Sequence, residues 1–342
     1  MAAVLAVLLA ASAASAAAPE GPRLAFVKLG FEPPRLELVT VNPAGTFPQR
    51  LAGGGIRRRP LPYPYSGPTW SPDGSQIVSA YSGSLNRERP RLALFIAAAD
   101  GSGLREIPGT VGALSPIFSP DGHTIAFARQ RVRIRRNGRG RTKTTYESAS
   151  IWLIDLAGGK PRRVTPWRDR LAQIPSSFSP DGKTLAITRL VGDQAPEAIG
   201  LTFDGSASTV LARNALEPVY SPDGATIAIL RGPQNAKQDR VSAIRTTDIY
   251  TIGSGGGSLR RLTATPRLVE LAPQWDPSGE RIAYAAIAPP GRSDSFLGLG
   301  GTIMEINTDG TCRNEVLSFP QGIVIGATWQ PGPGREAGRI SC

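Results

Sequence analysis

The chain has 342 residues, of which 40% are hydrophobic, so it can bury a substantial core in one large domain or two ordinary ones. Its formal net charge is +12, and its 39 glycines and 31 prolines suit many short strands joined by turns better than a helical protein. Beyond the N-terminus there is no 18-residue apolar segment, which argues against a membrane-spanning helix.

The first 18 residues have the features of an export signal. They carry no charge, run through an apolar core from Val4 to Ala10, and contain the small residues Ala14-Ser15-Ala16. This pattern is typical of a secretory signal peptide, although the usual basic start is missing. A disordered alanine-rich tail on a cytosolic protein is the alternative. We therefore expect residues 1–18 to be a signal peptide and the protein to be periplasmic or extracellular.

One five-residue phrase recurs along the chain. Trp70-Ser71-Pro72-Asp73-Gly74 precedes the apolar pair Ile77-Val78, and the further copies begin at Phe118, Phe178, Tyr220 and Trp275, with a degenerate copy at Trp329. Proline presets φ for a tight turn, the Asp side chain can bond nearby backbone, and glycine accepts positive φ. Each copy predicts a hairpin turn between an aromatic strand and an apolar strand.

Two more strand patterns follow each copy. The predicted third and fourth strands are 36–41 and 49–51, 92–97 and 104–107, 151–156 and 162–165, 198–203 and 209–212, 248–252 and 259–263, and 302–307 and 314–317. No turn phrase precedes the apolar strand at Arg23 to Val27, and no strand follows Trp329, so the two chain ends should complete one sheet. The sequence therefore predicts an all-β, six-bladed β-propeller of four-stranded antiparallel blades over residues 22–334, closed by pairing its N- and C-terminal strands. Residues 335–342 form a C-terminal tail.

The repeat resembles that of a known family. The aromatic-Ser-Pro-Asp-Gly phrase, the apolar strand, the Asp/Gly turn and the Arg-Leu-Thr-like strand are similar to the WD40-like (PD40) propeller repeat of the TolB family. The resemblance covers nearly all of the chain after the signal and implies the fold far more specifically than a function, because propellers serve many roles. Proteins of that family also carry an α/β domain before the propeller. Here the repeat starts near Arg23, so we expect that domain to be absent.

The two faces of such a ring differ in their loops. Turns between first and second strands and between third and fourth strands are short, and we call their side the tight-turn face. Second-to-third loops and the links between blades lie opposite, on the long-loop face, where function is expected. One of these loops, from Arg129 to Ser148, carries eight Arg and Lys residues against one acid, Glu147, and its Asn137-Gly138 predicts a protruding hairpin.

The basic composition of the long-loop face suggests a partner. It favours an acidic protein or an envelope polyanion of the teichoic-acid, glycan or anionic-lipid type, whose encounter clustered cations would steer. The alternative is a solvated ribbon whose charges prevent sheets from pairing edge to edge. Nucleic acid is disfavoured for an exported protein with few interleaved aromatics. We expect a monomer that binds its partner through Arg57, Arg58, Arg59, Arg131, Arg133, Arg135, Arg136, Arg139, Arg141, Lys143, Trp167 and Arg168.

Catalytic chemistry finds little support. The single histidine, His123, follows a turn phrase, and the chain has no G-x-S-x-G nucleophile elbow. The recurring aspartates belong to the turns rather than to a ring of ligands; they are Asp73, Asp121, Asp181, Asp223 and Asp276. We predict a non-enzymatic protein without catalytic residues, cofactor or metal. The alternative is a carbohydrate- or lactone-processing enzyme using carboxylates on the long-loop face, because such pairs have no local sequence pattern.

The two cysteines allow one crosslink. Cys312 falls in a turn of the last unit and Cys342 ends the chain, so a disulfide would hold the tail against the final sheet, as suits an exported protein. Two free thiols are the alternative.

Overall fold

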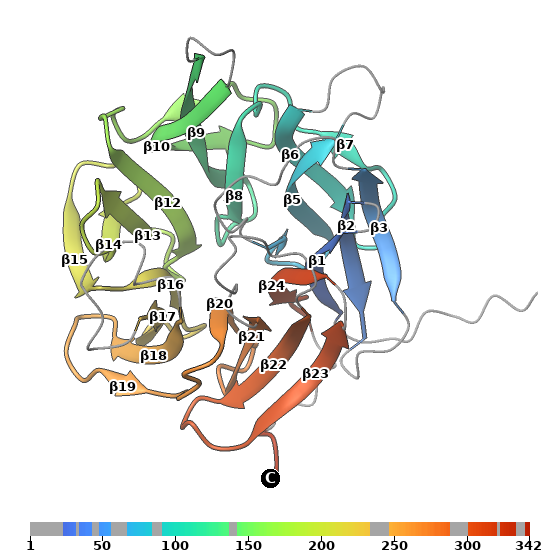
Figure 1. The fold of residues 1–342 in the computed structure, drawn as a ribbon, viewed down its shortest axis with the longest axis vertical. Helices are drawn as coiled ribbons and strands as arrows, with labels where there is room; N and C mark the ends of the chain where they lie inside the picture. Colours follow the sequence, from blue (N-terminus) through green and yellow to red (C-terminus); the bar gives the residue numbers. More distant parts are fainter. Residues whose placement is uncertain are drawn as a thin grey trace, which may run out of the picture.

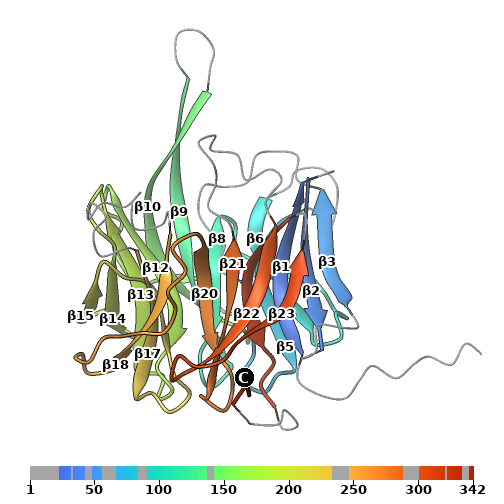
Figure 2. The same cartoon turned by 60° about the horizontal axis from the view of Figure 1, so that its bottom comes forward.

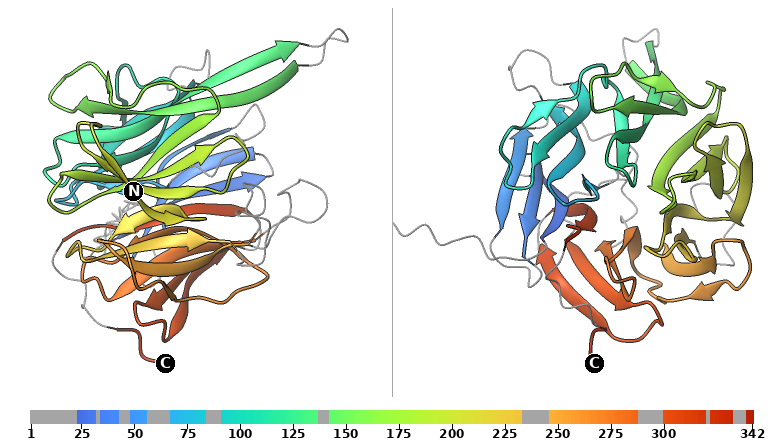
Figure 3. Two further views of the ribbon diagram at one scale, coloured as in Figure 1. Left: turned by 90° about the vertical axis from the view of Figure 1, so that its left-hand side faces the viewer. Right: turned by 180° about the vertical axis from the view of Figure 1, so that it is seen from behind.

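The computed structural model describes residues 23–31, 34–42, 48–55, 67–83, 91–136, 142–232, 246–287, 300–319, 322–332 and 339–342. The regular structure in these ranges consists of β-strands, which form small sheets around a common centre (Figure 1). Seen from behind, the same ring of sheets is apparent (Figure 3). The all-β, propeller-like arrangement predicted from the sequence is confirmed. No helix long and apolar enough to cross a membrane occurs in the described ranges.

The strands are grouped into five sheets. Four have four strands each, and the fifth has eight. The four-stranded sheets are β24 (Ile323–Trp329), β1 (Leu24–Phe31), β2 (Pro34–Val41) and β3 (Gln49–Gly55); β4 (Thr69–Trp70), β5 (Gln76–Gly83), β6 (Arg91–Ala98) and β7 (Arg105–Glu106); β16 (Leu216–Tyr220), β17 (Thr226–Arg231), β18 (Asp248–Gly253) and β19 (Arg260–Arg261); and β20 (Val269–Trp275), β21 (Arg281–Ile287), β22 (Gly301–Asn307) and β23 (Arg313–Phe319).

The eight-stranded sheet departs from the expected set of separate four-stranded sheets. It joins β8 (Ala113–Phe118), β9 (Thr124–Arg136), β10 (Thr142–Asp155) and β11 (Arg162–Arg163) to β12 (Leu171–Phe178), β13 (Thr184–Val191), β14 (Glu197–Thr202) and β15 (Ser208–Arg213). Each half is antiparallel, and one parallel pair, Ala149 with Ala172, connects them. A parallel pair of the same kind, Thr247 with Val269, lies between two of the other sheets, with Thr247 just before β18.

The first and last strands share a sheet. β1 pairs antiparallel with β24 from Leu24 opposite Trp329 to Leu29 opposite Ile323. The Gln330 N–H donates to Arg23 O at 2.8 Å, and the Gln330 side-chain amide donates to Gly74 O at 2.8 Å in the next turn. The two ends of the propeller are therefore joined to each other, as the incomplete first and last repeats predict.

The repeated phrase forms the turn expected from its chemistry. The aromatic residue is paired with the first apolar residue of the next strand, as in Phe118 with Ile125. In that copy the Ser119 hydroxyl donates to Asp121 at 2.5 Å, Asp121 accepts the His123 N–H at 2.9 Å, and Gly122 has a φ of 75°. The hydrogen bond from Ser119 is the main cause that lowers the pKa of Asp121. The same two contacts recur at Asp73, Asp181 and Asp223 and explain these aspartates locally. Asp276 takes the serine position of its copy and instead accepts the Arg281 N–H at 3.1 Å.

The core lies between neighbouring sheets. Trp70, for example, packs with Ala25, Val27 and Leu38 of the adjoining sheet and with Ile77 of its own. Because each sheet buries apolar side chains against the next, stability depends on the ring as a whole.

The C-terminal tail is attached to the last sheet. Cys312 and Cys342 form a disulfide with their Cα atoms 5.0 Å apart, one of the two states that the sequence leaves open. Asn307 adds two hydrogen bonds to Ile340, accepting from its N–H at 2.8 Å and donating to its carbonyl at 2.9 Å. The last four residues are thus held at β22 and β23.

Candidate functional site: a basic ribbon and its aromatic base

Strands β9 and β10 form the longest hairpin of the described chain, with 13 and 14 residues. Their register runs from Thr124 opposite Asp155 to Arg136 opposite Thr142, with one shift between Tyr146 and Ser148. The far half of this hairpin projects well beyond the ring (Figures 2 and 3). We call the pair the basic ribbon. It matches the protruding hairpin predicted from sequence, although the Asn137-Gly138 turn lies outside the described residues.

Two arginines at the base of the ribbon lie on tryptophan rings. The guanidinium carbon of Arg131 is 4.5 Å from the centre of the Trp167 ring, and that of Arg129 is 4.2 Å from the centre of a Trp152 ring. Arg129 and Arg131 are two residues apart on β9, so they occupy the same face of the strand. Trp152 belongs to β10, and Trp167 to the link between β11 and β12. The link therefore brings a second aromatic surface to the ribbon.

The two arginines differ in their surroundings. Arg129 is half-buried and also donates to Gly109 O, and burial lowers the pKa of its guanidinium. Arg131 is exposed, as is Arg168 beside Trp167. Neither of these two exposed cations has a carboxylate partner in the described part of the chain. They therefore leave positive charge available to a partner.

The predicted binding residues are only partly covered by the structure. Arg131, Trp167 and Arg168 lie together. The backbone of Arg133, Arg135, Arg136 and Lys143 continues the ribbon, with Arg135 opposite Lys143. Arg57, Arg58, Arg59, Arg139 and Arg141 lie outside the described residues. The prediction omitted Trp152 because it resembles any other apolar strand residue. Trp152 lies two residues after Ser150, which pairs with Arg129, so its side chain is on the same face as the two arginines.

A carboxylate near the centre of the ring was also missed. Glu217 lies on the inner strand β16 with a φ of 49°, at a bulge that recurs with left-handed residues at Ser115, Ala272 and Gly326. Its carboxylate accepts the Ala272 N–H at 2.6 Å, and burial raises its pKa to about 7. The only sequence signal was its position three residues before the aromatic of the phrase.

Groups suited to metal or nucleophilic chemistry are not assembled in the described ranges. No cluster of three His, Cys, Asp or Glu side chains there could hold a metal ion. His123 is exposed in its turn, where its carbonyl accepts the Leu156 N–H at 2.9 Å. The described site is thus a cationic and aromatic surface.

Comparison with known proteins supports the fold. No family model matches the chain. TolB of the Tol-Pal system from Anaeromyxobacter dehalogenans is 32% identical over 151 residues, which span 44% of this chain but only 30% of that protein. An uncharacterized protein of Agrobacterium fabrum is 24% identical over 259 residues, covering 72% of this chain and 76% of the relative.

Two solved structures have similar folds. TolB from Acinetobacter baumannii superposes with a TM-score of 0.64 at 22% identity, covering 91% of this chain and 67% of that one. A putative TolB from Agrobacterium tumefaciens gives a TM-score of 0.57 at 17% identity, covering 89% and 92%. The chain is therefore similar to TolB proteins in its propeller, and at these identities the structural likeness concerns the fold alone.

Proposed function

We propose that this protein is a non-enzymatic β-propeller of six blades, exported to the periplasm or the cell surface, which binds an acidic protein partner through its basic ribbon. The count of six treats the two antiparallel halves of the eight-stranded sheet as two blades. The proposed site comprises the ribbon and the link that carries Trp167 and Arg168. The partial similarity to TolB, a protein of the Tol-Pal system, supports a binding module of the cell envelope.

The observation that carries this proposal is the pair of arginine–tryptophan contacts. An arginine side chain has about 2 kcal/mol of rotamer entropy, part of which is lost on binding. Stacking on a ring contributes ~0.5–1 kcal/mol at an exposed site and orders the side chain before a partner arrives. Arg131 is thus already ordered, while its charge remains free of a carboxylate. A ribbon that served only to prevent edge pairing would not require this order.

The chemistry favours a protein over a simple polyanion. Tryptophan and arginine are the residue types that contribute most at protein–protein interfaces, where a ring fills a pocket and a guanidinium bonds carboxylates in pairs. Binding a polymer of phosphates or of sugar acids would require the positive charge of the ribbon but not the apolar area of Trp167. Binding of teichoic acid or anionic lipid is therefore a separate outcome of the test.

The test removes charge from the ribbon. A variant with Arg131, Arg133, Arg135 and Arg136 changed to Ser, and a second variant with Trp167→Ala, are compared with the native protein in binding to poly-glutamate, teichoic acid and anionic vesicles. Capture from an envelope extract, with quantitative identification of the captured proteins, is measured at low and high salt. We expect the arginine variant to lose affinity for the acidic polypeptide and most of its salt dependence. Trp167→Ala should weaken binding with little change in salt dependence.

A matched control removes the same charge elsewhere. Arg105, Lys160, Lys183 and Arg260 are exposed on outer strands or tight turns and can be changed to Ser together. This control should bind as the native protein does. If the control and the arginine variant of the ribbon lose the same binding affinity, only the net charge of the protein matters. If the arginine variant captures its partner as the native protein does, the ribbon is not the binding surface.

A further inference from the structure

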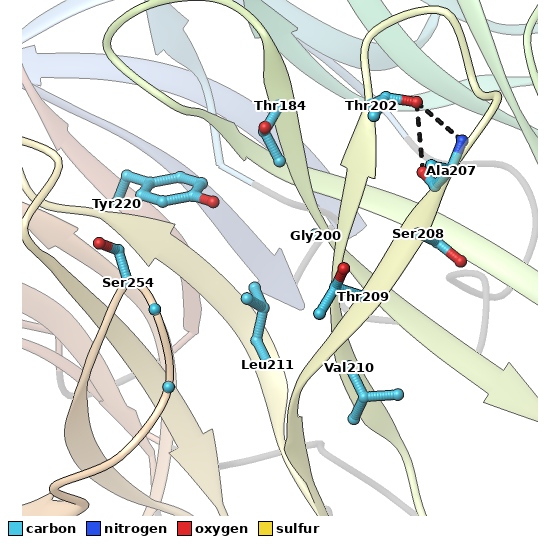
Figure 4. Close-up of a pocket in the computed structure, with 12 residues that line it drawn as sticks. Thr184, Gly200, Thr202, Ala207, Ser208, Thr209, Val210, Leu211, Tyr220 and Ser254 are labelled. Atoms are coloured by element: carbon cyan, nitrogen blue, oxygen red, sulfur yellow. Dashed lines mark hydrogen bonds between the residues drawn. The ribbon is translucent and has the colours of Figure 1, made fainter.

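A pocket lies between two neighbouring sheets on the tight-turn face. It has a volume of about 280 Å³ and is bounded by β13 to β15 on one side and by Tyr220 and the turn at Ser254 to Gly256 on the other (Figure 4). The turns involved connect β14 to β15 and β18 to β19. This face was expected to be the inactive one, so the pocket is a feature that the sequence did not predict.

The pocket exists because a side chain is missing from one position. In each unit, the second strand has a first apolar residue, such as Leu185 in β13. The residue after it, here Ala186, pairs with one residue of the third strand, here Gly200, and this third-strand residue defines the position. It is occupied by Thr40, Ile96, Leu153, Gly200, Thr251 and Glu305. All except Gly200 are buried side chains, and Leu153 packs against Phe178 and Leu185 of the other half of the eight-stranded sheet. Gly200 contributes no side chain at this position, and it is one of the residues that line the pocket.

The space left by Gly200 is not closed by its neighbours. A Cβ added there would lie 3.5 Å from side-chain atoms of Leu211 and Thr184, which is ordinary van der Waals contact. Gly200 is therefore not required by close packing, and its φ is not in the left-handed region. The absence of a side chain is better explained by the cavity that it leaves.

Hydroxyl groups dominate the polar lining. Thr184, Ser208, Thr209, Tyr220 and Ser254 line the pocket, and their hydroxyls have no hydrogen-bond partner in the part of the chain that is described. None of the described lining residues is charged. Leu211 supplies an apolar wall. In Figure 4 the Tyr220 hydroxyl points across the pocket toward β14 and β15.

Tyr220 is the member of the aromatic series that carries a hydroxyl. The other copies place Trp70, Phe118, Phe178 and Trp275 at this point, and packing alone requires only a ring. Burial, followed by the nearby charge of Asp181, raises the pKa of Tyr220. Its hydroxyl is therefore protonated at neutral pH and can both donate and accept a hydrogen bond.

We propose that this pocket binds one neutral sugar ring. A sugar presents hydroxyls that both donate and accept, as the Ser, Thr and Tyr hydroxyls do, and C–H faces that suit Leu211 and the Tyr220 ring. A phosphate or carboxylate would lose its hydration without gaining a cationic partner, which is unfavourable. The volume is just below the ~300–1,000 Å³ of pockets for drug-sized ligands, so one ring fits and further units would extend into solvent. This site is independent of the basic ribbon.

The experiment titrates the ¹⁵N-labelled full chain with glucose, galactose and N-acetylglucosamine, and in parallel with glucuronate and glucose 6-phosphate. We expect saturable shifts at the amides of Thr209, Tyr220 and Ser254 with at least one neutral sugar, with millimolar affinity, and none with the charged sugars. Tyr220→Phe, which restores the ring found in other copies, and Thr184→Val should each weaken binding about 5- to 10-fold, the effect of one neutral hydrogen bond. Gly200→Leu should abolish binding by filling the pocket.

The controls separate this site from other causes. Thr226→Val changes the matching turn position of the next sheet, and the ribbon variant removes the basic charge; both should bind sugar normally. If Gly200→Leu does not fold, the affinities of Tyr220→Phe and Thr184→Val for the sugar still test whether the pocket is the binding site. The proposal is overturned if no neutral sugar gives saturable shifts at the pocket, if the charged sugars bind equally well, or if both hydroxyl deletions leave the affinity unchanged.

Discussion

Removing the Trp70 side chain should weaken the ring where its two ends are joined. Trp70 is only 3% exposed and packs with Ala25, Val27 and Leu38 of the closing sheet. Its indole N–H donates to Thr328 O on β24 at 3.2 Å. One side chain thus contacts both the first and the last segments of the propeller.

The size of the effect follows from these contacts. Trp70→Ala leaves a cavity among buried side chains, and such changes cost ~3–5 kcal/mol. Trp70→Phe keeps a ring in place but loses the hydrogen bond to Thr328, which is worth about 1 kcal/mol, with some loss of packing. Trp70→Ala should therefore destabilise the protein more than Trp70→Phe does.

Equilibrium unfolding in urea, followed by circular dichroism, measures the difference. Trp167→Ala is the control, because this half-buried tryptophan stacks on Arg131 at the surface and its loss should cost about 1 kcal/mol or less. If Trp70→Ala shifts the midpoint no more than Trp167→Ala does, the closing junction does not support the ring as we have reasoned.

Three further outcomes can be checked by the same unfolding measurements. Cys312→Ser should lower the free energy of unfolding by about 3–4 kcal/mol, the chain-entropy value for a crosslink of 30-residue separation. A reductant should lower the stability of the native protein to that of the variant and leave the variant itself unaffected. Burial raises the pKa of Glu270 to about 7, so folding favours its protonated form; the stability it contributes is complete below about pH 4.5 and is lost as the pH rises to 7. Glu270→Gln should reduce this decline by up to about 3 kcal/mol, and an identical pH profile in both proteins would contradict the shift. Asp121→Ala removes the acceptor of two turn hydrogen bonds and should cost about 1–2 kcal/mol, more than Asp193→Ala, whose surface ion pair with Arg170 is worth little.

The strands were predictable because their signals are local. The turn phrase contains its own hydrogen-bond partners, as Ser119, Asp121 and Gly122 show, so five residues suffice to place a hairpin. The alternation of apolar residues then places the following strands, and the incomplete repeats at the two ends imply their pairing. The merging of two halves through Ala149 and Ala172 was not predictable, because it rests on one contact between strands of neighbouring repeats, which no local pattern specifies.

The two candidate sites differ in how visible they were. The basic ribbon was apparent from its run of arginines and its Asn-Gly turn. Its aromatic base was less apparent, because Trp152 and Trp167 reach Arg129 and Arg131 only through strand pairing and the path of a link. Glu217 was hidden for a related reason: its pKa depends on burial and on the backbone of Ala272 from another sheet.

The sequence by itself determined the repeat, the hairpins, the joining of the chain ends and the position of the charge, because each rests on short-range backbone chemistry or on composition. Only the tertiary structure decided which side chains meet across sheets. The pocket at Gly200 shows the difference most clearly, since one glycine among 39 becomes informative only when register aligns it with Leu153 and packing sets it opposite Tyr220. Packing between sheets brings together residues that are far apart in the chain, and no local sequence pattern predicts which of them will be in contact.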